Sequence, residues 1–224
     1  MKKLFLVIFT VLFCLVSNVG WTANLACKYT GFNCPEVGDI EELVEVDGLF
    51  FKKFTETPFT GKVIGGEAQG LIKDGLREGS WVEYYENGQL KKKGNYKDGK
   101  IDGLWELYYE DGQLWIKGNY KDGKKHGLWE WYYEDGQLER KVNYKDGKED
   151  GPLEEYDSDG QLEKKGNIKD GKEQDRLWEM YHKNGQLRVK GNFKDGKKHG
   201  LWEYFNEDGS LKKTETYKNG VKQE

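Results

Sequence analysis

Histidines, cysteines, tryptophans and lysines are the residues of this 224-residue chain whose types and spacing could do chemistry. His126 and His199 occupy equivalent places in two repeated segments, and His182 replaces a strand tyrosine found in earlier segments. None of the three has a cysteine or a second histidine close in sequence, whereas a metal site or a general base needs such partners. We expect no catalytic residue, no metal and no cofactor, and the chain is not predicted to be an enzyme.

Tryptophans could instead bind a partner through their rings. They recur near the start of successive segments, and Trp131 and Tyr133 follow Trp129 at alternate positions. Alternate side chains of a strand share one face, so these rings are expected to lie together. Packing explains repeated aromatic residues, but a one-layer sheet can leave one face of rings uncovered. The candidate partner face therefore comprises Trp105, Trp129, Trp131, Tyr133, Trp178 and Trp202.

Lysines form the second candidate surface, because they cluster at turns that should follow one long edge of a sheet. Its members are Lys121, Lys124, Lys125, Lys194, Lys197 and Lys198. An anionic polymer or an acidic partner could meet this edge, but turns are generally solvated and each lysine cluster carries its own aspartate. Without residues 1–23 the chain has 34 basic and 40 acidic residues, a net charge of −6, which argues against nucleic-acid binding.

The elements that must position these residues are repeated. A Lys-(Asp/Asn)-Gly tripeptide returns seven times between Lys73 and Lys218, at intervals of 24 residues and once 25. Asn-Gly or Asp-Gly pairs, from Asn87-Gly88 onward, keep the same rhythm, and both signals favour two-residue hairpin loops with positive φ at both residues. Each unit is predicted to be a β-hairpin. A glycine recurs in the second strand, as at Gly94 and Gly118, which suits a ring of a neighbouring strand lying over bare backbone.

The fourth unit departs from this pattern. Leu153 stands where a tryptophan is expected, Pro152 precedes it, and the next unit carries an extra residue within 173–176. Proline removes a ladder donor and an inserted residue can bulge a strand. We expect a bend or weak point between about residues 150 and 177, which is either a hinge or the result of sequence drift.

The run Gly-Asn-Tyr-Lys-Asp-Gly-Lys-Lys-His-Gly-Leu-Trp-Glu-Trp-Tyr-Tyr-Glu-Asp-Gly-Gln-Leu, from Gly118 to Leu138, resembles the bacterial MORN-repeat variant family. The resemblance covers roughly residues 58–222. It implies an all-β fold, an elongated single-layer antiparallel sheet of stacked hairpins, with roles in protein or membrane attachment and no catalytic residues. Some members of the variant subgroup are described as antitoxins of toxin-antitoxin systems.

The N-terminus indicates export. Lys2 and Lys3 precede a 13-residue apolar run, Leu4 to Val16, so residues 1–23 are predicted to be a signal peptide. Residues 24–57 form an N-terminal cap segment and residues 58–224 an array of about six to seven 24-residue hairpins. Cys27 lies ten residues past the apolar run, which disfavours a lipoprotein. In an oxidising compartment, a local disulfide between Cys27 and Cys34 is the simpler expectation.

Two functions follow from these observations. The first is an exported, periplasmic or secreted protein-interaction module, antitoxin-like or immunity-like, whose partner is another protein. The second is an envelope-associated structural protein that binds glycan, lipid or cell-wall polymer through the aromatic rings and the lysine edge. The oligomeric state is not predicted.

Overall fold

The computed structural model describes residues 36–173 and 177–224. The signal peptide, the lipidation site and the Cys27–Cys34 disulfide expected from the sequence lie outside the described residues. Most of the segment with the extra residue, 174–176, lies outside them as well.

The described chain is almost entirely β-strand, with one short 3₁₀ helix. The elements are β1 (Glu36–Gly38), η1 (Ile40–Glu42), β2 (Leu43–Val46), β3 (Leu49–Lys52), β4 (Gly61–Val63), β5 (Ala68–Lys73), β6 (Leu76–Tyr84), β7 (Leu90–Lys97), β8 (Lys100–Tyr108), β9 (Leu114–Lys121), β10 (Lys124–Tyr132), β11 (Leu138–Lys145), β12 (Lys148–Tyr156), β13 (Leu162–Lys169), β14 (Lys172–Glu173), β15 (Leu177–Tyr181), β16 (Leu187–Lys194), β17 (Lys197–Phe205), β18 (Leu211–Lys218) and β19 (Val221–Lys222).

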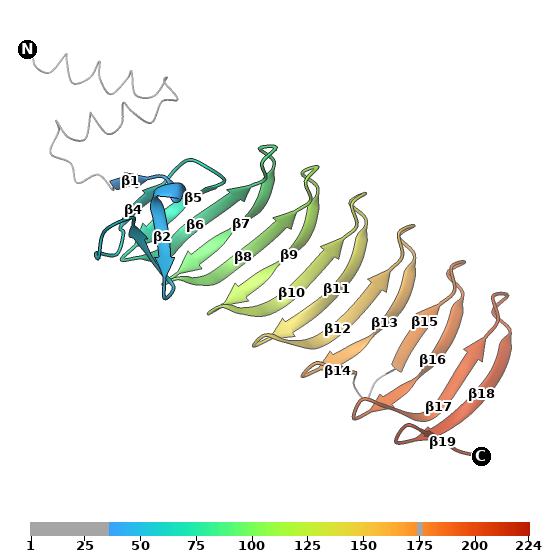
Figure 1. Ribbon diagram of the computed structural model, residues 1–224. Helices are drawn as coiled ribbons and strands as arrows, with labels where there is room; N and C mark the ends of the chain where they lie inside the picture. Colours follow the sequence, from blue (N-terminus) through green and yellow to red (C-terminus); the bar gives the residue numbers. More distant parts are fainter. Residues whose placement is uncertain (1–35, 174–176) are drawn as a thin grey trace, which may run out of the picture.

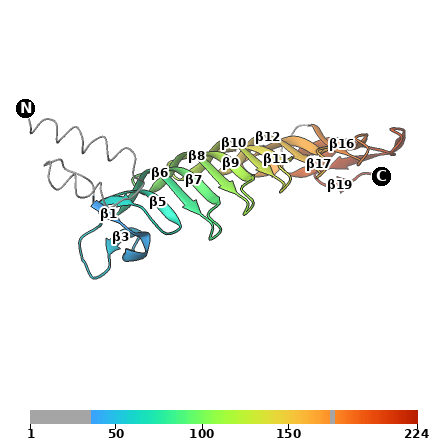
Figure 2. The ribbon, with the colours of Figure 1, turned by 90° about the horizontal axis from the view of Figure 1, so that it is seen from above.

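These strands form one long sheet of 17 strands in the described chain, with a separate β2–β3 hairpin. From β4 onward each strand pairs antiparallel with the next one in sequence, and β1 adds in parallel to β4. Strands β14 and β15 both pair with β13, so they are two pieces of one interrupted strand. The hairpins lie side by side in an elongated, twisted single layer (Figures 1 and 2), which confirms the predicted fold class. No helix among the described residues is long and apolar enough to cross a membrane.

The two turns of each unit differ, which corrects one expectation. In the Lys-Asp-Gly-Lys turns both central residues have positive φ, for example 51° at Asp122 and 79° at Gly123, as two-residue loops require. In the other set only the glycine does: Tyr109 N donates to Gln113 O at 2.8 Å, leaving three loop residues, Glu110 to Gly112. The Asp111 carboxylate accepts from Gln113 N at 2.9 Å and fixes this loop. The Asp-Gly pair alone therefore did not determine the loop length.

The core of the array is a row of tryptophans on one face of the sheet, each packed flat on a glycine. Trp129 is only 2% exposed, and a Cβ added at Gly118 on the neighbouring strand would lie 2.2 Å from its Cδ2 atom. The same relation joins Trp105 to Gly94, as the sequence predicted. Tyr120 packs edge-on between the two tryptophans, with its ring centroid 6.1 Å from Trp105 and 5.0 Å from Trp129. We call the side of the sheet that carries this row the tryptophan face.

The fourth unit keeps this packing with different residues. Leu153 replaces the tryptophan, and Val142 replaces the glycine that would lie beneath it; the two are paired across the strands and are 2% and 0% exposed. The added methyl groups of the valine thus fill space that a smaller leucine leaves. Pro152 lies where the β11–β12 register shifts, at a bulge, where a proline is tolerated. Strands β11, β12 and β13 stay continuously paired through this unit.

The N-terminal segment packs on the first hairpins. Phe50 and Phe59 are 5% and 3% exposed, and Phe50 N donates to Gly75 O at 2.8 Å. The Arg77 guanidinium lies 4.7 Å from the centre of the Phe50 ring. Phe54, between them in sequence, is fully exposed. The β2–β3 hairpin stands at the end of the sheet, beside β4 and β5 (Figure 1).

Candidate binding surfaces

The tryptophans of the predicted partner face are mostly inaccessible. Trp105, Trp129, Trp178 and Trp202 are between 1% and 7% exposed, because Tyr120, Tyr144 and their equivalents close over them. The Trp129 indole N–H also donates to Asn119 O at 3.0 Å. These four rings hold the hairpins together and cannot form the contact surface. The expectation that a one-layer sheet leaves its rings uncovered was wrong for them.

The accessible part of the tryptophan face is a row of side chains two residues after each buried position. We call it the outer row, and its members are half-buried: Glu83, Leu107, Trp131, Glu155, Met180 and Tyr204. Each is paired with a residue of the following strand, as Leu107 is with Ile116 and Trp131 with Arg140. Trp131 is thus the one tryptophan of the predicted partner face that is only half-buried. The chemistry of the outer row changes from unit to unit, whereas that of the buried row is nearly constant.

Tyr133 does not extend the outer row. Its hydroxyl donates to Tyr156 O, 2.8 Å away in the next hairpin. Tyr85 and Tyr109 make the same bond to Tyr108 O and Tyr132 O. We call these hydrogen bonds the tyrosine ties. His182 takes the same place farther along, with Nε2 3.0 Å from Phe205 O, so its role in this position is structural.

One tie is absent from the described chain. Asp157 occupies the tyrosine position of the fourth unit, and its carboxylate accepts from the backbone N–H groups of Asp159 and Gln161 within its own loop. The fourth and fifth hairpins therefore lack the bond that joins their neighbours. This feature lies inside the region where the sequence predicted a weak point.

The predicted basic edge divides into two groups. Lys121, Lys124, Lys194 and Lys197 are exposed at the two-residue turns. Lys125 instead folds over the tryptophan face, with Nζ 4.2 Å from the Trp129 ring centre and 5.0 Å from that of Tyr144. Lys198 repeats this arrangement over Trp202 at 4.3 Å. Burial lowers the pKa of Lys125, so this ammonium group is part of the packing and leaves the edge.

The opposite face carries a regular network of charges that we call the ionic face. The ion pairs Lys93–Glu106, Lys117–Glu130 and Lys190–Glu203 have N–O distances of 2.7, 2.9 and 2.9 Å. Hydrogen bonds to Glu106 and Tyr108 raise the pKa of Lys93. The side chains are partly exposed, so each pair contributes only about 0.2–1 kcal/mol. Because the charges neutralise one another, this face has little unpaired charge to offer a partner.

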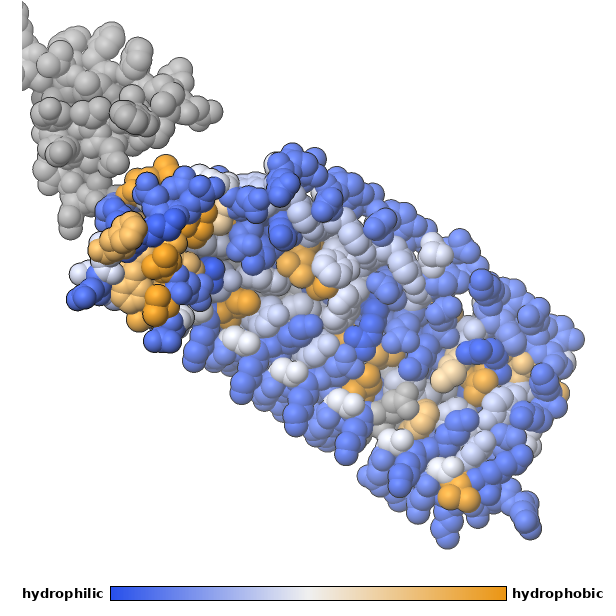
Figure 3. All heavy atoms as spheres, in the orientation of Figure 1, coloured by the Kyte–Doolittle hydropathy of each residue, from blue (hydrophilic) through white to orange (hydrophobic). Residues whose placement is uncertain are grey.

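The side of the array turned toward the viewer in Figure 3 is mostly hydrophilic, with small separated apolar areas. Apolar surface gathers near the N-terminal end. Among the described residues, no group of three or more histidine, cysteine, aspartate or glutamate side chains could hold a metal ion.

The repeat pattern and its hairpin geometry identify the family. The family model for the MORN repeat variant matches six successive segments, residues 77–98, 101–122, 125–146, 149–170, 177–195 and 198–219, which together make up more than half of the chain. The chain belongs to the MORN repeat variant family.

Beyond the family, the matches to known proteins are remote. This MORN-variant chain has 15% identity and a TM-score of 0.28 to a structure titled as accessory secretory protein 1, 2 and 3 in Streptococcus pneumoniae, covering 57% of this chain and 22% of that one. It has 18% identity and a TM-score of 0.30 to a GtfA/B complex bound to UDP and GlcNAc, covering 61% and 34%. It thus spans about a fifth of the first of these chains and about a third of the second. No curated protein matches it.

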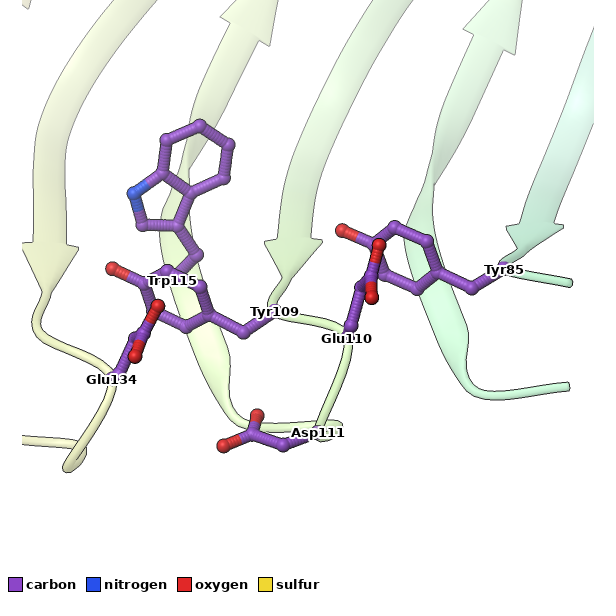
Figure 4. A pocket seen from close by; sticks show the side chains of 6 residues that line it. All are labelled: Tyr85, Tyr109, Glu110, Asp111, Trp115 and Glu134. Carbon is purple, nitrogen blue, oxygen red and sulfur yellow. The ribbon is translucent and has the colours of Figure 1, made fainter. Parts of the chain in front are cut away.

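One surface of the MORN-variant array escaped sequence analysis. A cleft of about 440 Å³ lies beside the three-residue loops and is lined by Tyr85, Tyr109, Glu110, Asp111, Trp115 and Glu134 (Figure 4). Trp115 is 40% exposed, and its ring centre lies 5.7 Å from that of Tyr109. The available signal was that Trp115 stands in a position where every other hairpin has a charged residue. A second cleft of about 420 Å³ near Met180 and His182 is lined by charges of both signs.

Proposed function

We propose that this MORN-variant chain is an exported, non-enzymatic scaffold whose outer row binds another protein. One observation carries the proposal: the buried row keeps tryptophan in five of six hairpins, while the outer row two residues away carries acidic, aliphatic, aromatic and thioether side chains. A constant interior with a changing exterior provides a rigid surface whose chemistry differs along its length. Repeat proteins commonly bind partners through such extended surfaces.

The centre of the proposed interface is the stretch from the second to the third hairpin. Here Leu107, Ile116 and Trp131 are half-buried hydrophobic residues packed against the core. Tryptophan contributes strongly to protein interfaces, and Arg140, with its guanidinium 5.1 Å from the Trp131 ring centre, adds a second favoured residue type. An antitoxin-like or immunity-like role is the finer form of this proposal, suggested by the family.

Export supports an envelope partner. Lys2, Lys3 and the apolar run from Leu4 to Val16 have the organisation of a signal peptide. Cell fractionation of the full-length chain, with mass analysis of the mature N-terminus, tests this part. Recovery of the intact chain from the cytoplasm would contradict it.

Affinity capture from an envelope extract tests the partner. The bait is the mature chain, residues 24–224, beside Trp131→Glu, which copies the Glu155 found in the equivalent position of the next unit. This substitution leaves Trp129 in the core, so the array is expected to fold. Leu128→Ser, on the ionic face, is the matched control because Ser80 occupies its equivalent position. A dominant protein retained by the wild type and the control but lost with Trp131→Glu supports the proposal; equal retention by all three baits contradicts it.

A second candidate function rests on the four exposed lysines of the two-residue turns. Successive units are two strands apart, roughly 10 Å at 4.7–4.9 Å per strand, so these ammonium groups recur along one edge. Such an edge could bind an anionic envelope polymer. Retention on that polymer should fall steeply as salt rises, whereas an interface around Trp131 should be less sensitive to salt.

A further inference from the structure

The cleft beside Trp115 breaks the symmetry of the array. The second residue of each returning strand is charged elsewhere: Lys91, Glu139, Glu163, Arg188 and Lys212. Trp115 is the extra residue of a β-bulge, because Leu107 pairs with Ile116 and Tyr108 with Leu114, so no cross-strand partner requires an indole there. At 40% exposure this ring leaves a large apolar surface in water at one unit only. A single exposed exception within an otherwise regular set indicates a specific use.

The rings of the cleft are held in place by the tyrosine ties. The hydroxyls of Tyr85 and Tyr109 donate to Tyr108 O and Tyr132 O, both at 2.7 Å, so their donor protons are already used. The Trp115 ring is tilted 36° from that of Tyr109. What remains for a ligand is mainly the faces of three aromatic rings, which carry partial negative charge.

The charges around these rings have one sign. The carboxylates of Glu110, Asp111 and Glu134 line the cleft, and no lysine or arginine does. Within the described chain neither Glu110 nor Glu134 makes an ion pair, whereas glutamates of the ionic face are paired with lysines. Figure 4 shows both glutamates reaching up from successive loops beside the tyrosine rings. Burial, followed by the negative charges of Glu139, Glu134 and Asp111, raises the pKa of Tyr109.

The preceding hairpin shows what such a site accommodates. Lys91, in the position equivalent to Trp115, places its Nζ 5.3 Å from the centre of the Tyr85 ring. In the next hairpin the indole replaces this internal cation and adds a ring, while the surrounding carboxylates remain. The site thus has an excess of cation-attracting groups and has lost its own cation.

We propose that the cleft formed by Tyr85, Tyr109 and Trp115 binds an alkylated ammonium ion, with Glu110 and Glu134 supplying the countercharge. Methylated ammonium groups suit this surface, because they spread their charge over apolar methyls that pack on aromatic faces and need no hydrogen-bond acceptor. The cleft lies beside the three-residue loops and no member of the outer row lines it, so this site is distinct from the proposed protein interface.

Choline, compared with its neutral isostere 3,3-dimethylbutanol, tests the proposal. Saturation-transfer NMR on the mature chain would measure binding of each compound by its methyl signal. We expect choline to bind in the millimolar range and the isostere much more weakly. Trp115→Lys, which copies Lys91, should weaken choline binding about fivefold or more, since it removes a ring and adds a like charge. Glu134→Gln should weaken binding by about threefold and reduce its dependence on salt.

Leu128→Ser, on the ionic face and outside the lining of the cleft, is the control and should leave choline binding unchanged. Near-ultraviolet circular dichroism would verify that each variant is folded. Three results would overturn the proposal. The neutral isostere could bind as well as choline, Trp115→Lys could bind choline as well as the wild type, or choline could give no saturable signal at tens of millimolar. When choline binds, competition by phosphatidylcholine vesicles or by a trimethyllysine peptide shows whether a lipid headgroup or a modified protein is the source.

Discussion

Exchange of the Gly118–Trp129 contact for the Val142–Leu153 contact gives the sharpest test of the packing. Trp129→Leu would leave a cavity and lose the indole hydrogen bond to Asn119, which we expect to cost about 3 kcal/mol of unfolding free energy. Gly118→Val would place a Cβ 2.2 Å from the indole and force it away, at a cost of about 3 kcal/mol.

The double variant should recover much of this loss. It recreates the valine–leucine pair that the chain already uses, so we expect it to cost about 3 kcal/mol in total, with a coupling free energy of about 3 kcal/mol between the two substitutions. Urea denaturation followed by circular dichroism would measure all four proteins, with midpoint and slope compared because repeat arrays unfold unit by unit. If the loss of unfolding free energy in the double variant equals the sum of the two single losses within about 0.5 kcal/mol, the reasoning is refuted.

Two further predictions concern the tyrosines. Tyr133→Phe removes the tie to Tyr156 O and should lower the free energy of unfolding by about 1 kcal/mol. Asp157→Tyr should supply the missing tie to Tyr181 O and raise the urea midpoint. An unchanged midpoint in both variants would show that the ties contribute nothing to stability. Burial, with the hydrogen bond to Glu149, raises the pKa of Tyr144 from 10.0 to about 12, so the neutral phenol is favoured in the folded chain. Its contribution is complete below pH 10 and is lost as the pH rises toward 12, and Tyr144→Phe should flatten the fall of the unfolding free energy in that range.

The sequence predicted the hairpins, their stacking and the glycine beneath each tryptophan, because these depend on local spacing and on period-two alternation. It did not predict the loop of three residues at Asp111, since an Asp-Gly pair fits two loop lengths and the strand register decides between them. It also left open whether the ring of Trp129 is exposed, because its burial depends on Tyr120, Tyr144 and Lys125 closing over it, and their distances are not contained in the spacing.

For the candidate sites, the sequence grouped residues that the fold separates. Lys125 was assigned to the same edge as Lys124, yet adjacent residues of a strand point to opposite sides, and Lys125 has rings within reach. Tyr133 was grouped with Trp131 as a contact residue, but its hydroxyl is bound to Tyr156 O of the next hairpin. The Trp115 cleft could have been found by aligning the units and looking for a position whose residue type differs from that of every other unit.

The valine–leucine pair of the fourth unit bears on how such an array can change its length. Val142 and Leu153 are 11 residues apart, as are Gly118 and Trp129, and each pair falls within one 24-residue period. A duplication or deletion of one period whose ends lie between two such pairs therefore carries a glycine with its tryptophan, or a valine with its leucine, and separates neither pair. Units of both kinds can then be inherited as self-consistent modules, and the array can lengthen or shorten without a clash at the new junction.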